Sequence, residues 1–214
     1  MGDGATRTTR RNDFRELIRY LSQNSSLLVV FLIAAILNLA LVGLTIGAPV
    51  IVAKHLGMQS SFVGIIEVAM GLGGLVGSGL VGIWPHRFSF KGICRYVAMI
   101  CFGVVPIIVT LLSGPDELAF AALAAGSAWV MAWASITSVE IVSFVQRSAP
   151  KELCGKVLAL VYMMLSCATP IGQLVYGLAY DRWTPAIVFA GMLAVLTLTT
   201  ALFYRLKSRL WRLS

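Results

Sequence analysis

Long runs of apolar residues, separated by short clusters of charged residues, glycine and proline, make up most of the chain. About 20 apolar residues in an α-helix cross a bilayer core of about 30 Å. Barrel strands would instead alternate apolar and polar residues, and these runs do not alternate. The pattern predicts an all-α integral membrane protein with six transmembrane helices, at residues 27–53, 61–84, 93–113, 118–144, 156–179 and 186–204.

Composition agrees with a membrane protein. Of the 214 residues, 58% are hydrophobic and 12% are charged, and the mean hydropathy is +0.87. Soluble domains carry about 25% charged residues. The net charge of +8 does not indicate nucleic-acid binding, because nearly all basic residues flank the apolar runs, where they set topology and contact anionic headgroups. We therefore expect the lipid bilayer as a partner and no nucleic acid.

The basic residues between the spans are distributed unevenly. The two tails and the second and fourth loops carry fifteen Lys and Arg residues, whereas the first and fifth loops carry one each, Lys54 and Arg182. Since basic residues concentrate in cytoplasmic loops, we expect a multi-pass protein of the cell (inner) membrane with both termini in the cytoplasm. The predicted organisation is a basic tail (1–26), a six-helix domain (27–204) and a second basic tail (205–214).

The first tail contains one periodic segment. Phe14, Leu17, Ile18 and Leu21 fall at i, i+3, i+4 and i+7, which is typical of a short amphipathic helix lying on a membrane surface. A disordered basic tail is the alternative.

Polar side chains in the fifth span recur every three or four residues, so they share one helical face. Polar groups are costly in lipid, so this face is expected to line a water-accessible cavity; the alternative is interhelical hydrogen bonding with interfacial tyrosines at the ends. The residues are Tyr162, Ser166, Thr169, Gln173, Tyr176 and Tyr180.

The first and fourth spans also contain polar residues. Asn38 and Thr45 share a face of the first span with Pro49, which is expected to bend or loosen that helix. The fourth span has scattered polar residues, and its Trp129 and Trp133 could form an aromatic wall or simply pack between helices. The third and sixth spans are almost wholly apolar and are expected to be peripheral and lipid-facing.

The second span combines one carboxylate with many small residues. Gly71, Gly74, Ser78 and Gly82 form a small-residue face on which a neighbouring helix could approach closely. Glu67 is a candidate for proton or substrate binding, with a snorkelling or hydrogen-bonded carboxylate as the alternative. For Glu140, in the fourth span, a local partnership with Arg147 is favoured over a transport role.

Intramembrane catalysis is not supported by the sequence. The histidines, His55 and His86, fall in loops, and no HExxH motif is present. Ser78 lacks the GxSG context of a rhomboid-type serine protease, and Asp181 has no second intramembrane aspartate. The four cysteines form no CxxC pair. We expect no enzyme activity, no metal and no cofactor.

Two loops carry a family resemblance. After the second span, Gly82, Arg87 and Lys91 follow a G-x-x-x-D-R-x-G-x-R/K spacing, with His86 replacing the acid and Ser89 the second glycine. The loop after the fourth span follows Q-x-x-x-P-x-E-x-x-G-R-V more specifically, through Gln146, Pro150, Glu152, Gly155 and Lys156, with lysine where arginine is usual. Both patterns resemble those of major facilitator superfamily transporters, the second that of the macrolide-efflux and enterobactin-exporter type.

The resemblance implies the C-terminal six-helix half of a twelve-helix major facilitator, built as a 3+3 inverted repeat. It implies spans 1, 2, 4 and 5 around a central cavity, proton-coupled efflux of small amphipathic molecules such as drugs or siderophores, and the two loops as conformational latches. A second six-helix half would be required, either a homodimer partner or a separate N-terminal half. The substrate-binding surface would then comprise Asn38, Thr45, Glu67, Tyr162, Ser166, Thr169 and Gln173. A noncatalytic membrane scaffold or an inactive truncated remnant is the alternative.

Overall fold

The computed structural model describes residues 25–210, apart from the side chains of residues 25, 26, 28, 29, 152 and 206–210. Within this part of the chain, six helices are long and apolar enough to cross a membrane, which confirms the predicted all-α membrane architecture. The predicted amphipathic helix at residues 14–21 lies outside the described residues. The helices are α2 (Ser25–Val50), continued by the π-helix η1 (Ile51–His55), α3 (Ser60–Ile83), α4 (Ile93–Ser113), α5 (Asp116–Ser148), α6 (Lys151–Arg182) and α7 (Pro185–Leu210).

Local sequence accounts for the helix ends. Asp116 and Glu117 lie in the first turn of α5 and Arg147 in its last turn, so each charge sits at the helix end whose dipole attracts it. Pro150 then precedes the first residue of α6 in an extended conformation. After Pro49, which has no N–H to donate, the backbone widens to π geometry, in which the Leu56 N–H donates to Ile51 O at 2.8 Å. The expected loosening of the first span is therefore present.

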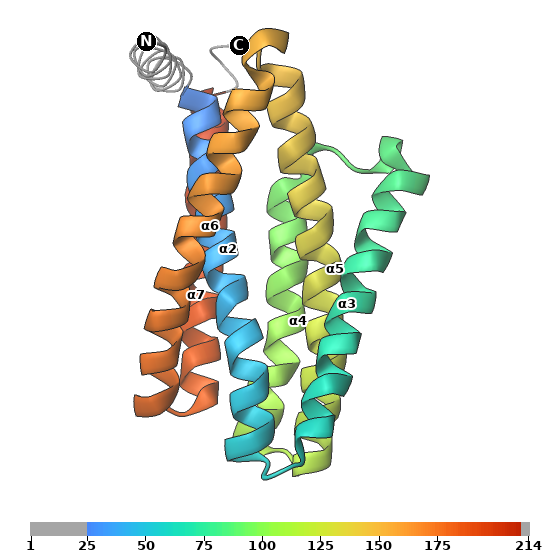
Figure 1. The fold of residues 1–214 in the computed structure, drawn as a ribbon, viewed down its shortest axis with the longest axis vertical. Coiled ribbons are helices and arrows are strands. Elements are labelled where there is room, and N and C mark those ends of the chain that lie inside the picture. The colour runs from blue at the N-terminus through green and yellow to red at the C-terminus, as the bar shows by residue number, and fades with distance from the viewer. Residues whose placement is uncertain (1–24, 211–214) are drawn as a thin grey trace, which may run out of the picture.

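The six helices form two groups of three (Figure 1). The central helix α2 packs against α6 and α7, and the central helix α5 packs against α3 and α4, while α4 and α7 join the groups by packing against each other. Exchanging α2, α3 and α4 with α5, α6 and α7 leaves this set of contacts unchanged. Because α2 and α5 run in opposite directions (Figure 1), the arrangement is that of two inverted three-helix repeats.

Both ends of the described chain lie at one end of the bundle (Figure 1). The α3–α4 loop, with its 3-10 turns η2 (Pro85–Arg87) and η3 (Phe90–Gly92), and the α5–α6 junction lie at that same end. The opposite end carries the other three connections. The basic loops at residues 87–95 and 147–156 therefore share one end with the start of α2 and the end of α7, as the uneven charge distribution predicts.

Within this chain, the third and sixth spans, which are expected to be peripheral and lipid-facing, are more buried than the second and fifth. In an 18-residue apolar window of each helix, 33% of the residues of α4 and 39% of those of α7 are buried, against 22% in α3 and 17% in α6. The reason is that α4 and α7 each contact a central helix and also each other, whereas α3 and α6 each pack mainly against one helix. The polarity of its side chains indicates whether a helix can face lipid. It does not indicate how many other helices of the chain that helix contacts.

The predicted small-residue face of the second span is not the face that packs against another helix of this chain. The face that packs against α5 contains Gly73 and Gly77, whose added Cβ atoms would overlap the carbonyl oxygens of Ala128 and Ala132. A Gly-x-x-x-Gly pair on α3 thus meets an Ala-x-x-x-Ala pair on α5, and the two backbones touch. Open space surrounds the Cα atoms of the predicted face at Gly71, Gly74 and Gly82, and Ser78 is exposed.

Candidate functional site

A small cavity of about 90 Å³ lies between α2, α5 and α6, close to Ile100 of α4. Its wall is mainly aliphatic, formed by alanine, leucine, isoleucine and valine side chains. Three polar side chains line it: Asn38 from α2, Ser138 from α5 and Tyr162 from α6. Apolar walls with a few converging polar groups are typical of small-molecule sites.

Asn38 connects the cavity to the fifth span. Its Nδ2 donates to the Leu165 backbone oxygen at 3.1 Å and to Thr169 Oγ1 at 3.2 Å. Thr169 Oγ1 in turn donates to Leu165 O at 3.0 Å. Because both hydrogens of Asn38 Nδ2 are used in these bonds, the amide group is held in one orientation. Its oxygen Oδ1 is the atom that can accept a further hydrogen bond.

The structure brings together only part of the predicted binding surface. Tyr162 lines the cavity with 54% of its surface exposed. Ser166 and Gln173 are exposed further along α6, and Thr45 is exposed on α2, where its hydroxyl donates to Val42 O. These side chains lie on the two packed helices α2 and α6 but outside the cavity.

Glu67 lies apart from this group. Its side chain is exposed on α3, which packs against α5 on the other side of the bundle (Figure 1). A common site containing Glu67 and Tyr162 is therefore not formed by close contact within this chain.

The predicted stripe on α6 serves two different purposes, which corrects the reading of all six residues as cavity-lining. Tyr180 is buried, and its hydroxyl donates to Gly43 O at 3.0 Å. The ring of Tyr176 fills the space that a side chain at Gly43 would occupy, and Tyr180 does the same at Gly47. The two tyrosines thus lock α6 against glycines of α2, and only the half of the stripe nearer Tyr162 remains for a ligand.

The tryptophan pair of α5 packs between helices. Trp129 Nε1 donates to Met99 O at 2.9 Å, and Trp133 stacks on Tyr96 with ring centroids 5.9 Å apart. Both contacts are to α4, so packing, and not an aromatic cavity wall, is the correct interpretation. Ser138, by contrast, was one of several scattered polar residues in the sequence, and no periodicity distinguished it as a cavity residue.

Glu140 and Arg147 form the predicted pair. Arg147 Nη2 lies 3.8 Å from Glu140 Oε2, and the Glu140 side chain is only 6% exposed. The carboxylate also interacts with the Phe90 backbone, at the end of the α3–α4 loop. Glu140 therefore links the end of α5 to the loop that precedes α4.

The remaining loop residues of the family motifs lie at the same end of the bundle. Arg87 is exposed and its guanidinium carbon lies 5.9 Å from the Trp84 ring centroid, and Lys91 donates its backbone N–H to Ser89 Oγ. Gly82 is exposed at the end of α3. These residues flank the loop that Glu140 contacts.

In the second motif, Pro150 precedes α6, and Gln146, Gly155 and Lys156 are exposed. The side chain of Glu152 lies outside the described residues. The segment thus joins α5 to α6 next to the Glu140–Arg147 pair.

Metal chemistry has no evident site in the described part of the chain, where no group of three His, Cys, Asp or Glu residues could hold an ion. The four cysteines, all within the described residues, form no disulfide. The cavity presents an apolar wall with three polar side chains, and among the described residues that line it no nucleophile is paired with a base.

Comparison with known families adds one finding. A family described as "Transmembrane secretion effector", of the major facilitator type, matches residues 6–213. No curated protein and no solved structure matches the chain.

Proposed function

The chain belongs to the transmembrane secretion effector family of major facilitator transporters, and from that premise we propose that it is the C-terminal six-helix half of an exporter of small amphipathic molecules. Membership makes it a multi-pass membrane transporter and not an enzyme. The assignment to the C-terminal half is supported by the loop at residues 146–157, whose motif is typical of the loop between the tenth and eleventh helices of such transporters.

The observation that carries the proposal is the small cavity lined by Asn38 and Tyr162. Its volume of about 90 Å³ is small beside the roughly 300–1,000 Å³ of pockets that enclose a whole ligand. A cavity of this size holds one group of a larger molecule, and the rest of the substrate needs a wall from outside this chain. A second six-helix unit facing α2 and α6 would supply it.

Substrate binding would use both kinds of lining group. The Tyr162 ring offers a flat apolar surface, and the Asn38 amide oxygen offers an acceptor to a hydroxyl or ammonium group. Thr45, Ser166, Thr169 and Gln173 would extend this surface along α2 and α6. Small amphipathic molecules that carry a hydroxyl or ammonium group, such as drugs or siderophores, meet these requirements.

Proton coupling is assigned to Glu67, the exposed carboxylate on α3. A carboxylate in a transmembrane helix is a functional candidate because exposure to lipid is costly for its charged form. In the complete transporter, a partner would enclose Glu67. The enclosed carboxylate would then bind and release a proton during transport. Glu67→Gln should then abolish proton-driven transport while leaving energy-independent substrate binding intact.

The partner would dock on the exposed apolar flanks of α3 and α6. Val68, Leu72 and Leu75 on α3, and Leu174 and Leu178 on α6, are all more than half exposed. The partner is a second copy of this chain or a separate N-terminal half.

Cross-linking distinguishes these partners. In a chain with its four cysteines replaced by alanine, Val68→Cys should form a disulfide-linked homodimer if the partner is a second copy. Val109→Cys, also more than half exposed but on α4, is the matched control and should stay monomeric. A monomer at both positions would count against a second copy that brings Val68 to the dimer axis and would favour a separate half.

The basic end of the bundle is assigned to the cytoplasm of a cell whose inner membrane holds the protein. The exposed Arg87, Arg147 and Lys151 lie at that end, whereas Asp116 and Glu117 begin α5 at the other. The motif loops, tied together by Glu140, would act as latches that change contacts as the two halves rock.

Efflux of a fluorescent amphipathic dye from energised membrane vesicles tests the function. The chain is expressed alone and together with an N-terminal half of the same family, and Tyr162→Ala is compared with Phe102→Ala, an exposed aromatic on α4 away from the cavity. Restored efflux that Tyr162→Ala lowers at least about tenfold, with Phe102→Ala unaffected, supports the proposal. Absence of efflux from every assembled combination would identify a nontransporting scaffold.

A further inference from the structure

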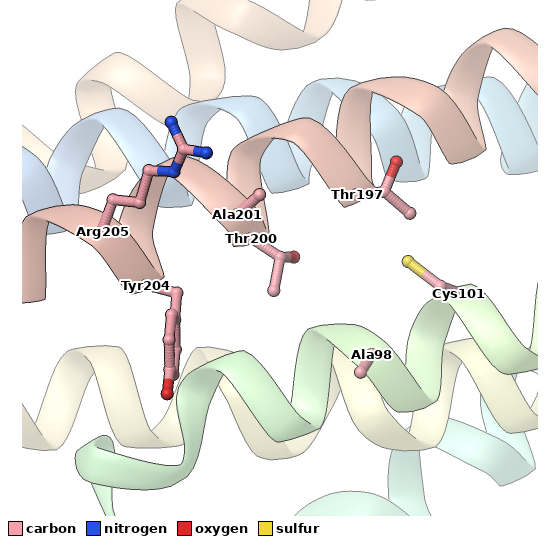
Figure 2. Close-up of a pocket in the computed structure, with 7 residues that line it drawn as sticks. All are labelled: Ala98, Cys101, Thr197, Thr200, Ala201, Tyr204 and Arg205. Carbon is pink, nitrogen blue, oxygen red and sulfur yellow. The ribbon is translucent and has the colours of Figure 1, made fainter.

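Two cavities of the described chain differ in the groups that they offer to a ligand. The larger, of about 460 Å³, is an open groove between α4 and α7 (Figure 2). The hydroxyls of Thr197 and Thr200 donate to carbonyls of α7 itself, and the Arg205 guanidinium lies on the side of α7 away from the groove (Figure 2). The smaller, of about 90 Å³, is the cavity lined by Asn38 and Tyr162. Its polar groups converge, so it is the cavity that can orient part of a ligand.

The smaller cavity lies between the two three-helix groups. Its walls come from α2 and α6 of one group and from α5 and Ile100 of α4 of the other. Ala34 on α2 and Ala134 on α5, one from each central helix, are both buried and both line it. Larger side chains at these two positions would fill the space, so the two alanines keep it open.

The cavity is apolar at its floor and polar at its mouth. Ile100 and Ile141, which line the floor, are buried. Asn38 is half-buried, and Ser138 and Tyr162 are exposed. An apolar group that reaches the floor is therefore surrounded by hydrocarbon. A polar atom next to that group lies near the Asn38 amide oxygen and the Ser138 hydroxyl.

The volume limits the size of the group that fits. An engineered apolar cavity of about 150 Å³ binds benzene, which has six carbon atoms. In proportion, a cavity of about 90 Å³ holds a group of about three or four carbons. A branched alkyl group such as 2-methylpropyl is within this limit, and a six-membered ring exceeds it.

We propose that the cavity is a subsite for one short alkyl group of the substrate, of about three or four carbons, next to a hydroxyl or ammonium group. The alkyl group lies between Ala34 and Ala134 against Ile100, and the hydroxyl or ammonium group donates to Asn38 Oδ1. This inference rests on the proposed function and adds the chemical class of the group by which a substrate is selected. Ala34, Ala134 and Ile100 determine specificity, because their size sets the size of that group.

Disulfide tethering measures the fit without transport. In the full-length chain with its four cysteines replaced by alanine, Ser138→Cys places a thiol at the mouth of the cavity. The purified protein in detergent is equilibrated with equal concentrations of methyl, 2-methylpropyl and cyclohexyl disulfides at a fixed concentration of mercaptoethanol. Mass spectrometry then gives the amount of each group that the protein retains.

Retention should be greatest for the group that fills the cavity. Each buried methylene group favours binding about fourfold, or about 0.8 kcal/mol. We therefore expect 2-methylpropyl to be retained about tenfold more than methyl. Cyclohexyl, which is too large, should be retained severalfold less than 2-methylpropyl.

Ser166→Cys is the matched control, because Ser166 is also an exposed serine but lies on α6 outside the cavity. At that position retention should follow hydrophobicity alone, so cyclohexyl should be retained most.

Two changes in the lining test the size limit at Ser138→Cys. Ala134→Val adds two carbons to the wall and should lower retention of 2-methylpropyl about tenfold, with methyl unchanged. Ile100→Ala removes three carbons from the floor and should make cyclohexyl the best-retained group. Ile141→Ala, which removes three carbons from the same lining, repeats this test in case helical circular dichroism shows that Ile100→Ala is unfolded.

The hydroxyl contact is tested with two tethered groups of equal size. A 2-hydroxypropyl group differs from 2-methylpropyl only in a hydroxyl that replaces one methyl group. Asn38 Oδ1 can accept a hydrogen bond from this hydroxyl, and Asn38→Leu removes the acceptor. The substitution should lower retention of 2-hydroxypropyl relative to 2-methylpropyl about twofold to tenfold, which is the range of one hydrogen bond.

Equal retention of the three alkyl groups at Ser138→Cys, or the same order of retention at Ser166→Cys, would overturn the proposal. Continued exclusion of cyclohexyl from a folded variant with the enlarged floor would also overturn it. Tethering needs neither a partner nor transport, so size selection without dye efflux from any assembled combination would count against the proposed function alone. Dye efflux without size selection in tethering would count against this subsite alone.

Discussion

Replacing Gly77 by alanine should separate α3 from α5. A Cβ at this position would overlap the Ala132 carbonyl oxygen and would lie 2.8 Å from the Ala132 carbonyl carbon. Carbon atoms in good contact are about 3.5–4.0 Å apart, so the helices must move by roughly 0.7 Å or more. The obstacle is backbone held in a helix, so no side-chain rotation relieves it.

The expected loss in free energy of unfolding is about 1–2 kcal/mol. Overpacking costs about 1–3 kcal/mol, and the better helix propensity of alanine offsets up to about 1 kcal/mol of it. Gly74→Ala is the matched control, because an added Cβ there meets nothing within 4 Å. That variant should be neutral or more stable by up to about 1 kcal/mol.

Both variants are measured by SDS titration in mixed micelles, with helical circular dichroism as the signal. The transition midpoint should fall for Gly77→Ala and stay or rise for Gly74→Ala. Equal shifts in the same direction would show that Gly77 is not at a backbone contact, and the close approach of α3 to α5 would be refuted. The test therefore decides between the packing face of the structure and the face predicted from the small-residue pattern.

Three further changes probe the other helix contacts. Tyr180→Phe removes the hydrogen bond to Gly43 O and should lower the free energy of unfolding by about 0.5–1.5 kcal/mol in the same titration; no change would mean that the ring alone holds α6 to α2. Arg147→Gln leaves the buried Glu140 carboxylate without its ion pair and should cost about 1–3 kcal/mol, most of which Glu140→Gln added in the same chain should restore; additive losses in this double-mutant cycle would contradict the pairing. Asn38→Leu should lower dye efflux by the assembled transporter at least about tenfold, and efflux at the unchanged rate would remove Asn38 from the binding surface.

The number and type of the helices could be predicted because they depend on local composition. An apolar run of membrane length has few alternatives to a helix in lipid, since every backbone group must be hydrogen-bonded within the segment. The Glu140–Arg147 pair was also predictable, because seven residues along a helix bring two side chains to the same side within two turns.

Contacts between helices could not be predicted from local composition. The second span contains glycines on several faces, and only the position of α5 selects Gly73 and Gly77 as the packing pair. Likewise Tyr162 and Tyr180 belong to one stripe on α6, but the position of α2 places glycines beside the second tyrosine and a cavity beside the first. Helical periodicity states which residues share a face. What that face meets depends on how separate helices dock, and that is set by packing between residues far apart in the chain.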